Sequence, residues 1–157
     1  MDTLIRENLI ETGTRKDILG NRLVLIAPIS NTMDLSISKN LDITFALGDS
    51  RLAIGDPNFV PAGQYAASAL KQLGIWHQVV DRLAPGSDVR NTLTLVQRGE
   101  AVLGIVYETD VPAGKNIRIV DYFPIDSYPP VIYSFGIIRG KNSPAVQSFY
   151  DYLTGVK

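Results

Sequence analysis

Residues 51–66 read Arg51-Leu-Ala-Ile-Gly-Asp-Pro-Asn-Phe-Val-Pro-Ala-Gly-Gln-Tyr-Ala66. The apolar run Arg51–Ile54 predicts a short buried strand, which a Gly-Asp-Pro turn ends. Over Pro61–Leu73 the apolar residues recur every three or four positions, which predicts a helix. Pro61 suits the first helical position and Gly74 suits the residue just past the helix end. A strand joined to a helix by a short loop is the unit from which α/β folds are built.

The same alternation of apolar and amphipathic runs continues on both sides of this stretch. Further strands are predicted at Arg22–Ala27, Val102–Tyr107, Ile117–Phe123 and Val131–Arg139. Further helices are predicted at Asp88–Arg98, at Pro144–Leu153, over residues 3–19 with an interruption near Gly13, and as a short turn around Leu41–Leu47. Because the strands are almost continuously apolar, we expect a three-layer α/β architecture with the sheet covered on both faces.

Composition excludes several classes of function. The 157 residues contain no cysteine and one histidine, His77, so a metal site built from cysteine or histidine ligands is not expected. The formal net charge is −1, which gives no footprint for nucleic acid or for an anionic membrane. No apolar run is long enough for a membrane span, and no signal peptide opens the chain.

Three positions could offer hydrogen-bond donors to an anion. The predicted helix at Pro61 leaves the first amides, those of Ala62 and Gly63, without partners inside the helix. The predicted helix after Asp88 does the same for the amide of Val89, with Arg90 adding charge. Tyr107 lies at the carboxyl end of a predicted strand, where ligands of open α/β sheets gather. Each pattern also has an ordinary explanation: a capped helix, a solvated arginine or a buried tyrosine.

The sequence gives no support for an enzyme. No Gly-rich phosphate loop, nucleophile elbow or metalloprotease helix is present. Glu108 and Asp110 follow Tyr107 but have no partner at a ligand spacing, so we expect them to be solvated or to cap the loop.

Residues 51–66 resemble the signature of bacterial periplasmic molybdate-binding proteins, the substrate-binding components of ABC importers. The resemblance extends over Thr14–Asn21, Leu23–Pro28, Leu73–Trp76, Leu83–Pro85, Asp88–Arg90, Leu103–Tyr107 and Phe149–Leu153. It implies a three-layer, type II periplasmic binding protein-like fold with two lobes. It implies a periplasmic location and delivery of the ligand to an ABC transporter permease.

The resemblance also implies the ligand and its contacts. Members bind molybdate or tungstate through neutral donors, which fall here on the amides of Ala62 and Val89 and on the hydroxyl of Tyr107. Gly63 and Arg90 are secondary candidates, and neither a cofactor nor a protein-ligated metal is implied. Since molybdate has no proton to donate at neutral pH, a site made only of donors selects it against protonated oxyanions. Sulfate or another tetrahedral anion remains an alternative ligand, and an effector-binding module of a transcription regulator remains an alternative role.

Compared with the family, this sequence lacks the start of the first lobe, which carries further serine and backbone donors. We expect residues 1–20 and 139–157 to be remnants of the first lobe and residues 21–138 to be an entire second lobe. Two missing donors would lower the affinity for molybdate by about 3–6 kcal/mol, so weak or undetectable binding is expected from this chain alone. Apolar surface that the first lobe would cover is expected to favour self-association.

Overall fold

The computed structural model describes residues 1–155, and the chain divides into two compact units. Unit 1 comprises Met1–Gly20 and Val131–Lys157, and unit 2 comprises Asn21–Pro130. The elements in chain order are α1 (Asp2–Arg6), β1 (Lys16–Asn21), β2 (Leu23–Pro28), α2 (Thr44–Leu47), β3 (Leu52–Gly55), α3 (Pro61–Gln72), α4 (Trp76–Val79), η1 (Val80–Arg82), β4 (Leu83–Gly86), α5 (Val89–Gln97), β5 (Leu103–Tyr107), η2 (Glu108–Ala113), β6 (Ile117–Tyr122), β7 (Val131–Phe135) and α6 (Pro144–Thr154).

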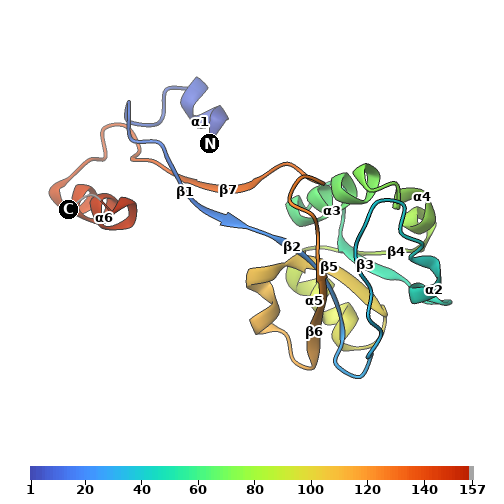
Figure 1. Ribbon diagram of the computed structural model, residues 1–157. Coiled ribbons are helices and arrows are strands. Elements are labelled where there is room, and N and C mark those ends of the chain that lie inside the picture. Colours follow the sequence, from blue (N-terminus) through green and yellow to red (C-terminus); the bar gives the residue numbers. More distant parts are fainter. Residues whose placement is uncertain (156–157) are drawn as a thin grey trace. The chain divides into compact units, whose positions relative to one another are not determined.

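Unit 2 is built on a five-stranded mixed sheet in the order β4-β3-β5-β2-β6 (Figure 1). Strand β3 runs parallel to both β4 and β5, whereas β2 runs antiparallel to both β5 and β6. The apolar run expected as a strand forms β2, and its residues Leu23–Ala27 are 0% exposed. Burial of consecutive residues requires cover on both faces of the sheet, because side chains alternate between the faces.

The two faces of this sheet are covered by different helices. Leu93 and Val96 of α5 pack in one apolar cluster with Val24, Ile26 and other alternate strand residues. The strand residues between them are also buried and point to the opposite face. Helix α3 contacts β2, β3 and β5 with its small buried residues and supplies a second layer. The expected three-layer arrangement is therefore confirmed for unit 2.

Strand β4 and the short helix α4 were not predicted from the sequence. Strand β4 has four residues, and Pro85 lies inside it. Proline cannot donate a ladder hydrogen bond, so it argues against a central strand. Strand β4 stands at the edge of the sheet with β3 as its neighbour, and an edge strand tolerates proline.

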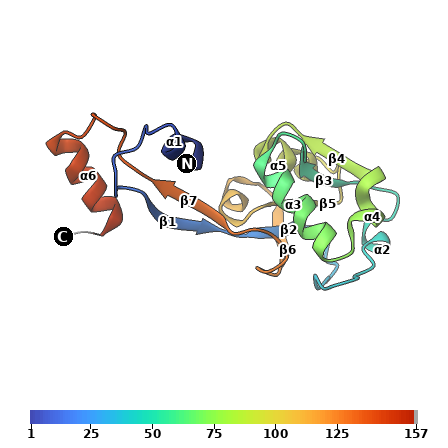
Figure 2. The same ribbon diagram turned by 90° about the horizontal axis from the view of Figure 1, so that it is seen from above.

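Unit 1 is a two-stranded ribbon of β1 and β7 with the helices α1 and α6 (Figure 2). The expectation of helix over residues 3–19 is wrong beyond α1, because β1 is a strand paired with β7. Asn8 and Gly13 have positive φ angles of 59° and 79°, which a continuous helix does not allow. Helix α6 begins as expected, with the Ser143 side chain accepting a hydrogen bond from the Val146 amide.

The segment after Pro130 belongs to unit 1 by its contacts. Strand β7 ends at Phe135, and residues 131–138 lie in unit 1. The reason is local pairing. Ser134 donates a hydrogen bond to Asp17 at 2.5 Å, and the Glu11 amide donates to the carbonyl of Ile137 at 2.7 Å. These contacts tie the segment after Pro130 to the N-terminal residues.

Candidate functional site

A cavity of about 450 Å³ lies in unit 2 where α3 and α5 begin and β5 ends. Its lining residues are Val60, Pro61, Ala62, Asp88, Val89, Arg90 and Tyr107. Four residues singled out in the sequence, namely Ala62, Val89, Arg90 and Tyr107, are thus brought together at one cavity. The fifth, Gly63, is not among its lining residues.

The topology of the sheet explains why these residues meet. Strands β4, β3 and β5 are neighbours and run parallel, so their carboxyl ends reach the same edge of the sheet. Helix α3 follows β3, helix α5 follows β4, and β5 ends at Tyr107. The cavity therefore occupies the position outside the carboxyl ends of strands at which α/β folds bind ligands.

The start of α3 lies at this cavity and has no side-chain cap. Val60 makes no capping hydrogen bond with its side chain, and Pro61 at the first helical position has no N–H group. The amide of Ala62 is consequently the first N–H group of the helix, and it lies at the positive end of the helix dipole. Ala62 has only a methyl side chain, so a ligand can approach its backbone closely.

Gly63 has a packing role beside this amide. A Cβ atom on Gly63 would lie 1.9 Å from the carbonyl oxygen of Gly55, the last residue of β3. A Cβ atom on Gly55 would in turn lie 2.5 Å from the Val60 side chain. Two glycines thus let the first turn of α3 pack directly on the end of β3, which fixes the position of the Ala62 amide.

The start of α5 offers a second amide. The Asp88 carboxylate caps this helix and accepts a hydrogen bond from the Asn91 amide at 2.7 Å. Val89 is the first helical residue, so its amide has no partner within the helix. Two helix N-termini thus contribute amides and partial positive charge to the same cavity.

Tyr107 packs against Tyr65, which in turn packs against Tyr128. Its ring meets Tyr65 of α3 edge-on at a centroid distance of 6.4 Å, and Tyr65 meets Tyr128 in the same manner at 6.4 Å. The Tyr128 hydroxyl accepts a hydrogen bond from the Leu23 amide at 3.1 Å. Such edge-to-face contacts restrict ring motion, so the Tyr107 hydroxyl is presented in a defined place.

The charged side chains near the cavity are of both signs. Asp88 and Arg90 line it, and Arg90 lies close enough to Asp110 to affect its ionisation. Burial raises the pKa of the Asp110 carboxyl, and the nearby Arg90 charge opposes that increase. The Asp88 carboxylate is engaged as the cap of α5 through its hydrogen bond with the Asn91 amide.

Glu108, the residue after Tyr107, accepts a side-chain hydrogen bond that the sequence did not predict. Glu108 is half-buried and accepts a hydrogen bond from the hydroxyl of Tyr122 at 3.0 Å. The Arg22 guanidinium stacks over the Tyr122 ring, 4.1 Å from its centroid. Sequence spacing could not reveal this group, because its members come from three different parts of the chain and meet through strand register.

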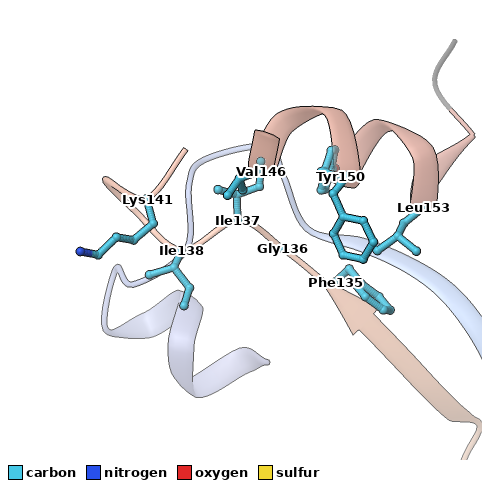
Figure 3. A pocket seen from close by; sticks show the side chains of 9 residues that line it. Phe135, Gly136, Ile137, Ile138, Lys141, Val146, Tyr150 and Leu153 are labelled. Atoms are coloured by element: carbon cyan, nitrogen blue, oxygen red, sulfur yellow. The ribbon is translucent and has the colours of Figure 1, made fainter. Parts of the chain in front are cut away.

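A second cavity, of about 260 Å³, lies within unit 1 and is mostly apolar (Figure 3). Tyr150 and Leu153 project from α6 toward Phe135, and Val146 of the same helix lies near Ile137 of the segment after β7. It offers few groups for a polar ligand.

Among residues 1–155, no group of three or more His, Asp or Glu side chains is placed to hold a metal ion. No described helix is long and apolar enough to span a bilayer.

The sequence is similar to known solute-binding proteins. The family model for bacterial extracellular solute-binding proteins matches residues 1–157. The molybdate-binding protein ModA of Escherichia coli (strain K12) is 45% identical over 156 residues, which are 99% of this chain and 61% of that protein. ModA of Haemophilus influenzae is 45% identical over 154 residues, which are 98% of this chain and 60% of that protein. The chain therefore spans about three fifths of the length of these relatives.

A solved structure agrees with the sequence comparisons. It is described as the substrate-binding domain of a molybdenum ABC transporter from Clostridium difficile. The likeness has a TM-score of 0.81 and 29% identity, and it covers 100% of this chain and 66% of the other. The fold of this chain is thus that of a solute-binding protein.

Proposed function

We propose, since this chain belongs to the family of bacterial extracellular solute-binding proteins, that its cavity in unit 2 binds a tetrahedral oxyanion, molybdate or tungstate. The observation that carries the proposal is the meeting of three neutral donors at one cavity: the amides of Ala62 and Val89 and the hydroxyl of Tyr107. The ModA proteins of two bacteria, at 45% identity, are named for binding molybdate, which supports this choice of anion.

The chemistry of the donors suits a fully ionised oxyanion. The amide groups and the phenol hydroxyl each donate one hydrogen bond, and every oxygen of molybdate is an acceptor. A protonated oxyanion would place its own O–H group against a donor of the site, and its affinity would be lower. The two helix N-termini add positive potential without a mobile side chain. Sulfate has the same donor needs, so the size of the complete cavity would distinguish the two anions.

In the proposed role the protein is a receptor rather than an enzyme. It would capture the oxyanion in the periplasm and deliver it to the permease of an ABC importer, as the resemblance implies. Unit 2 would be the second lobe, and unit 1 would be part of the first lobe. With the three donors of unit 2 as the only contacts, residues 1–157 alone would bind the oxyanion weakly.

The test is an NMR titration of ¹⁵N-labelled protein with molybdate, chosen because it measures weak binding. We expect shifts in the amides of Ala62 and Val89 and a dissociation constant weaker than low micromolar. Tyr107→Phe should weaken binding about tenfold to a hundredfold, because a hydrogen bond to a charged group contributes about 1.5–3 kcal/mol. Calorimetry would provide a second value where the affinity allows it.

The matched control is Tyr152→Phe, which removes a hydroxyl from a tyrosine that is 81% exposed in unit 1. It should leave the dissociation constant unchanged. Sulfate is the control anion. Absence of any shift at millimolar molybdate, or equal affinity in Tyr107→Phe and the unaltered protein, would rule out the proposed site. Stronger binding of sulfate than of molybdate would keep the site but change its ligand.

A further inference from the structure

Three side chains meet at the end of β5: Arg22 directly before β2, Glu108 directly after β5, and Tyr122 at the end of β6. The Tyr122 hydroxyl donates to the Glu108 carboxylate at 3.0 Å, and the Arg22 guanidinium lies 4.1 Å from the centre of the Tyr122 ring. We call Arg22, Glu108 and Tyr122 the β5 clamp. None of the three lines the cavity, and the function proposed above assigns no role to any of them.

The strand register places the β5 clamp beside the binding tyrosine. In the ladder between β2 and β5, Leu23 pairs with Tyr107, and in the ladder between β2 and β6, Val24 pairs with Tyr122. The Glu108 amide donates to the carbonyl of Arg22 at 2.9 Å, which continues the β2–β5 ladder by one residue. The side-chain hydrogen bond from Tyr122 therefore spans β2 and reaches the residue that follows Tyr107.

This arrangement restricts movement of the backbone directly after Tyr107, the residue that supplies the hydroxyl donor. Strand β5 ends at Tyr107, and the irregular helix η2 begins at the next residue, Glu108. Both a backbone and a side-chain hydrogen bond hold Glu108 to the adjacent strands. The hydrogen bond with Glu108 is also the first cause that raises the pKa of Tyr122.

We propose that Tyr122 and Glu108 are positioning residues for Tyr107: their hydrogen bond fixes the end of β5 and thereby the place of the Tyr107 hydroxyl in the oxyanion site. Arg22 holds the Tyr122 ring from its face through a cation–π contact. The inference rests on the function proposed above. It adds that affinity for the oxyanion depends on residues that never touch it, because a misplaced donor forms a weaker hydrogen bond.

The experiment compares variants by the same NMR titration with molybdate. Tyr122→Phe keeps the ring under Arg22 and removes only the hydroxyl. We expect binding about three- to tenfold weaker, because a displaced Tyr107 hydroxyl would lose part of its hydrogen bond to the anion and not all of it. Glu108→Ala and Glu108→Gln both remove the negative charge, but only glutamine keeps an oxygen that accepts from Tyr122. Glu108→Gln should therefore bind more tightly than Glu108→Ala.

A double-mutant cycle separates positioning from a general loss of stability. If Tyr122 acts through Tyr107, Tyr122→Phe should have little further effect in a Tyr107→Phe protein. Hydrogen exchange of the Glu108 amide should be faster in Tyr122→Phe, because the end of β5 is held less firmly. A purely structural role would instead weaken binding equally in both backgrounds.

The outcomes distinguish this inference from the function on which it rests. If the unaltered protein gives no shifts with molybdate, the proposed function fails and this inference fails with it. If Tyr107→Phe weakens binding while Tyr122→Phe binds like the unaltered protein, only the positioning role is overturned. Equal affinities of Glu108→Ala and Glu108→Gln would also overturn it.

Discussion

Gly63 shows how one residue fixes the place of a donor. In most helices, replacing glycine by alanine stabilises the protein by about 1 kcal/mol, because glycine loses more backbone entropy on folding. At Gly63 the added Cβ would lie 1.9 Å from the Gly55 carbonyl oxygen, so the helix would have to move away from β3. We therefore expect Gly63→Ala to lower the free energy of unfolding by about 1–3 kcal/mol, the usual cost of overpacking.

Chemical denaturation measures this change in stability. Ser68→Ala is the control, because it introduces alanine into the same helix at a half-buried position. It should change stability by a few tenths of a kcal/mol at most, on the order of a surface substitution. A Gly63→Ala protein as stable as the unaltered one would show that α3 has room to shift, and the close packing of Gly55 on Gly63 would then not be needed.

At the scale of the element, the β1–β7 ribbon is stabilised by a hydrogen bond whose strength depends on pH. The Ser134 hydroxyl donates to Asp17 at 2.5 Å, and this bond is the main reason that the pKa of Asp17 lies below its ordinary value of 3.8. A carboxyl with a lowered pKa stabilises the folded state above 3.8, and that contribution is lost as the pH falls through the folded pKa.

We expect Ser134→Ala to raise the pKa of Asp17 toward 3.8 and to weaken the loss of stability in acid. A carboxyl ¹³C NMR titration of Asp17 checks this directly. Asp42 provides an internal control, because its lowered pKa depends on Thr44 in unit 2 and should stay the same in the variant. An unchanged Asp17 pKa would mean that Arg15, which also lowers it, is the dominant partner.

The elements also show what sequence can predict and why. Helices α3 and α5 were predicted because each combines an apolar stripe with a clear start and stop signal. Strand β1 was missed because its residues Lys16–Asn21 are mostly exposed and carry no apolar alternation; pairing with β7 creates it. Strand β4 was missed because four residues containing proline give too little pattern.

The candidate site was likewise predicted only where local sequence patterns locate its residues. Ala62, Val89 and Tyr107 lie at strand and helix ends, which local patterns locate well, and parallel strand order then brings them to one edge. The β5 clamp depends on the register between strands that are distant in sequence, which no local pattern encodes. The packing of Tyr65 and Tyr128 behind Tyr107 has the same origin.

At the scale of the whole molecule, exposed apolar surface is concentrated in unit 1. Among the described residues, ten of the fifteen exposed large apolar side chains belong to this unit, although it is the shorter one. They include Phe149 at 62% exposure and Ile138 at 59%, both beside the apolar cavity under α6. The β1–β7 sheet has only two strands, and an isolated pair is marginally stable in water.

We expect the polypeptide of residues 1–157 to self-associate through this surface, because apolar patches exposed on a soluble protein favour contact with another copy. Sedimentation velocity over a range of concentrations should show the sedimentation coefficient rising with concentration. Phe149→Ser should reduce the association, whereas Phe45→Ser, which removes a phenylalanine 85% exposed in unit 2, should leave it unchanged. Equal effects of the two substitutions would place the contact elsewhere, and a monomer at every concentration would show that unit 1 tolerates its exposed side chains without a partner.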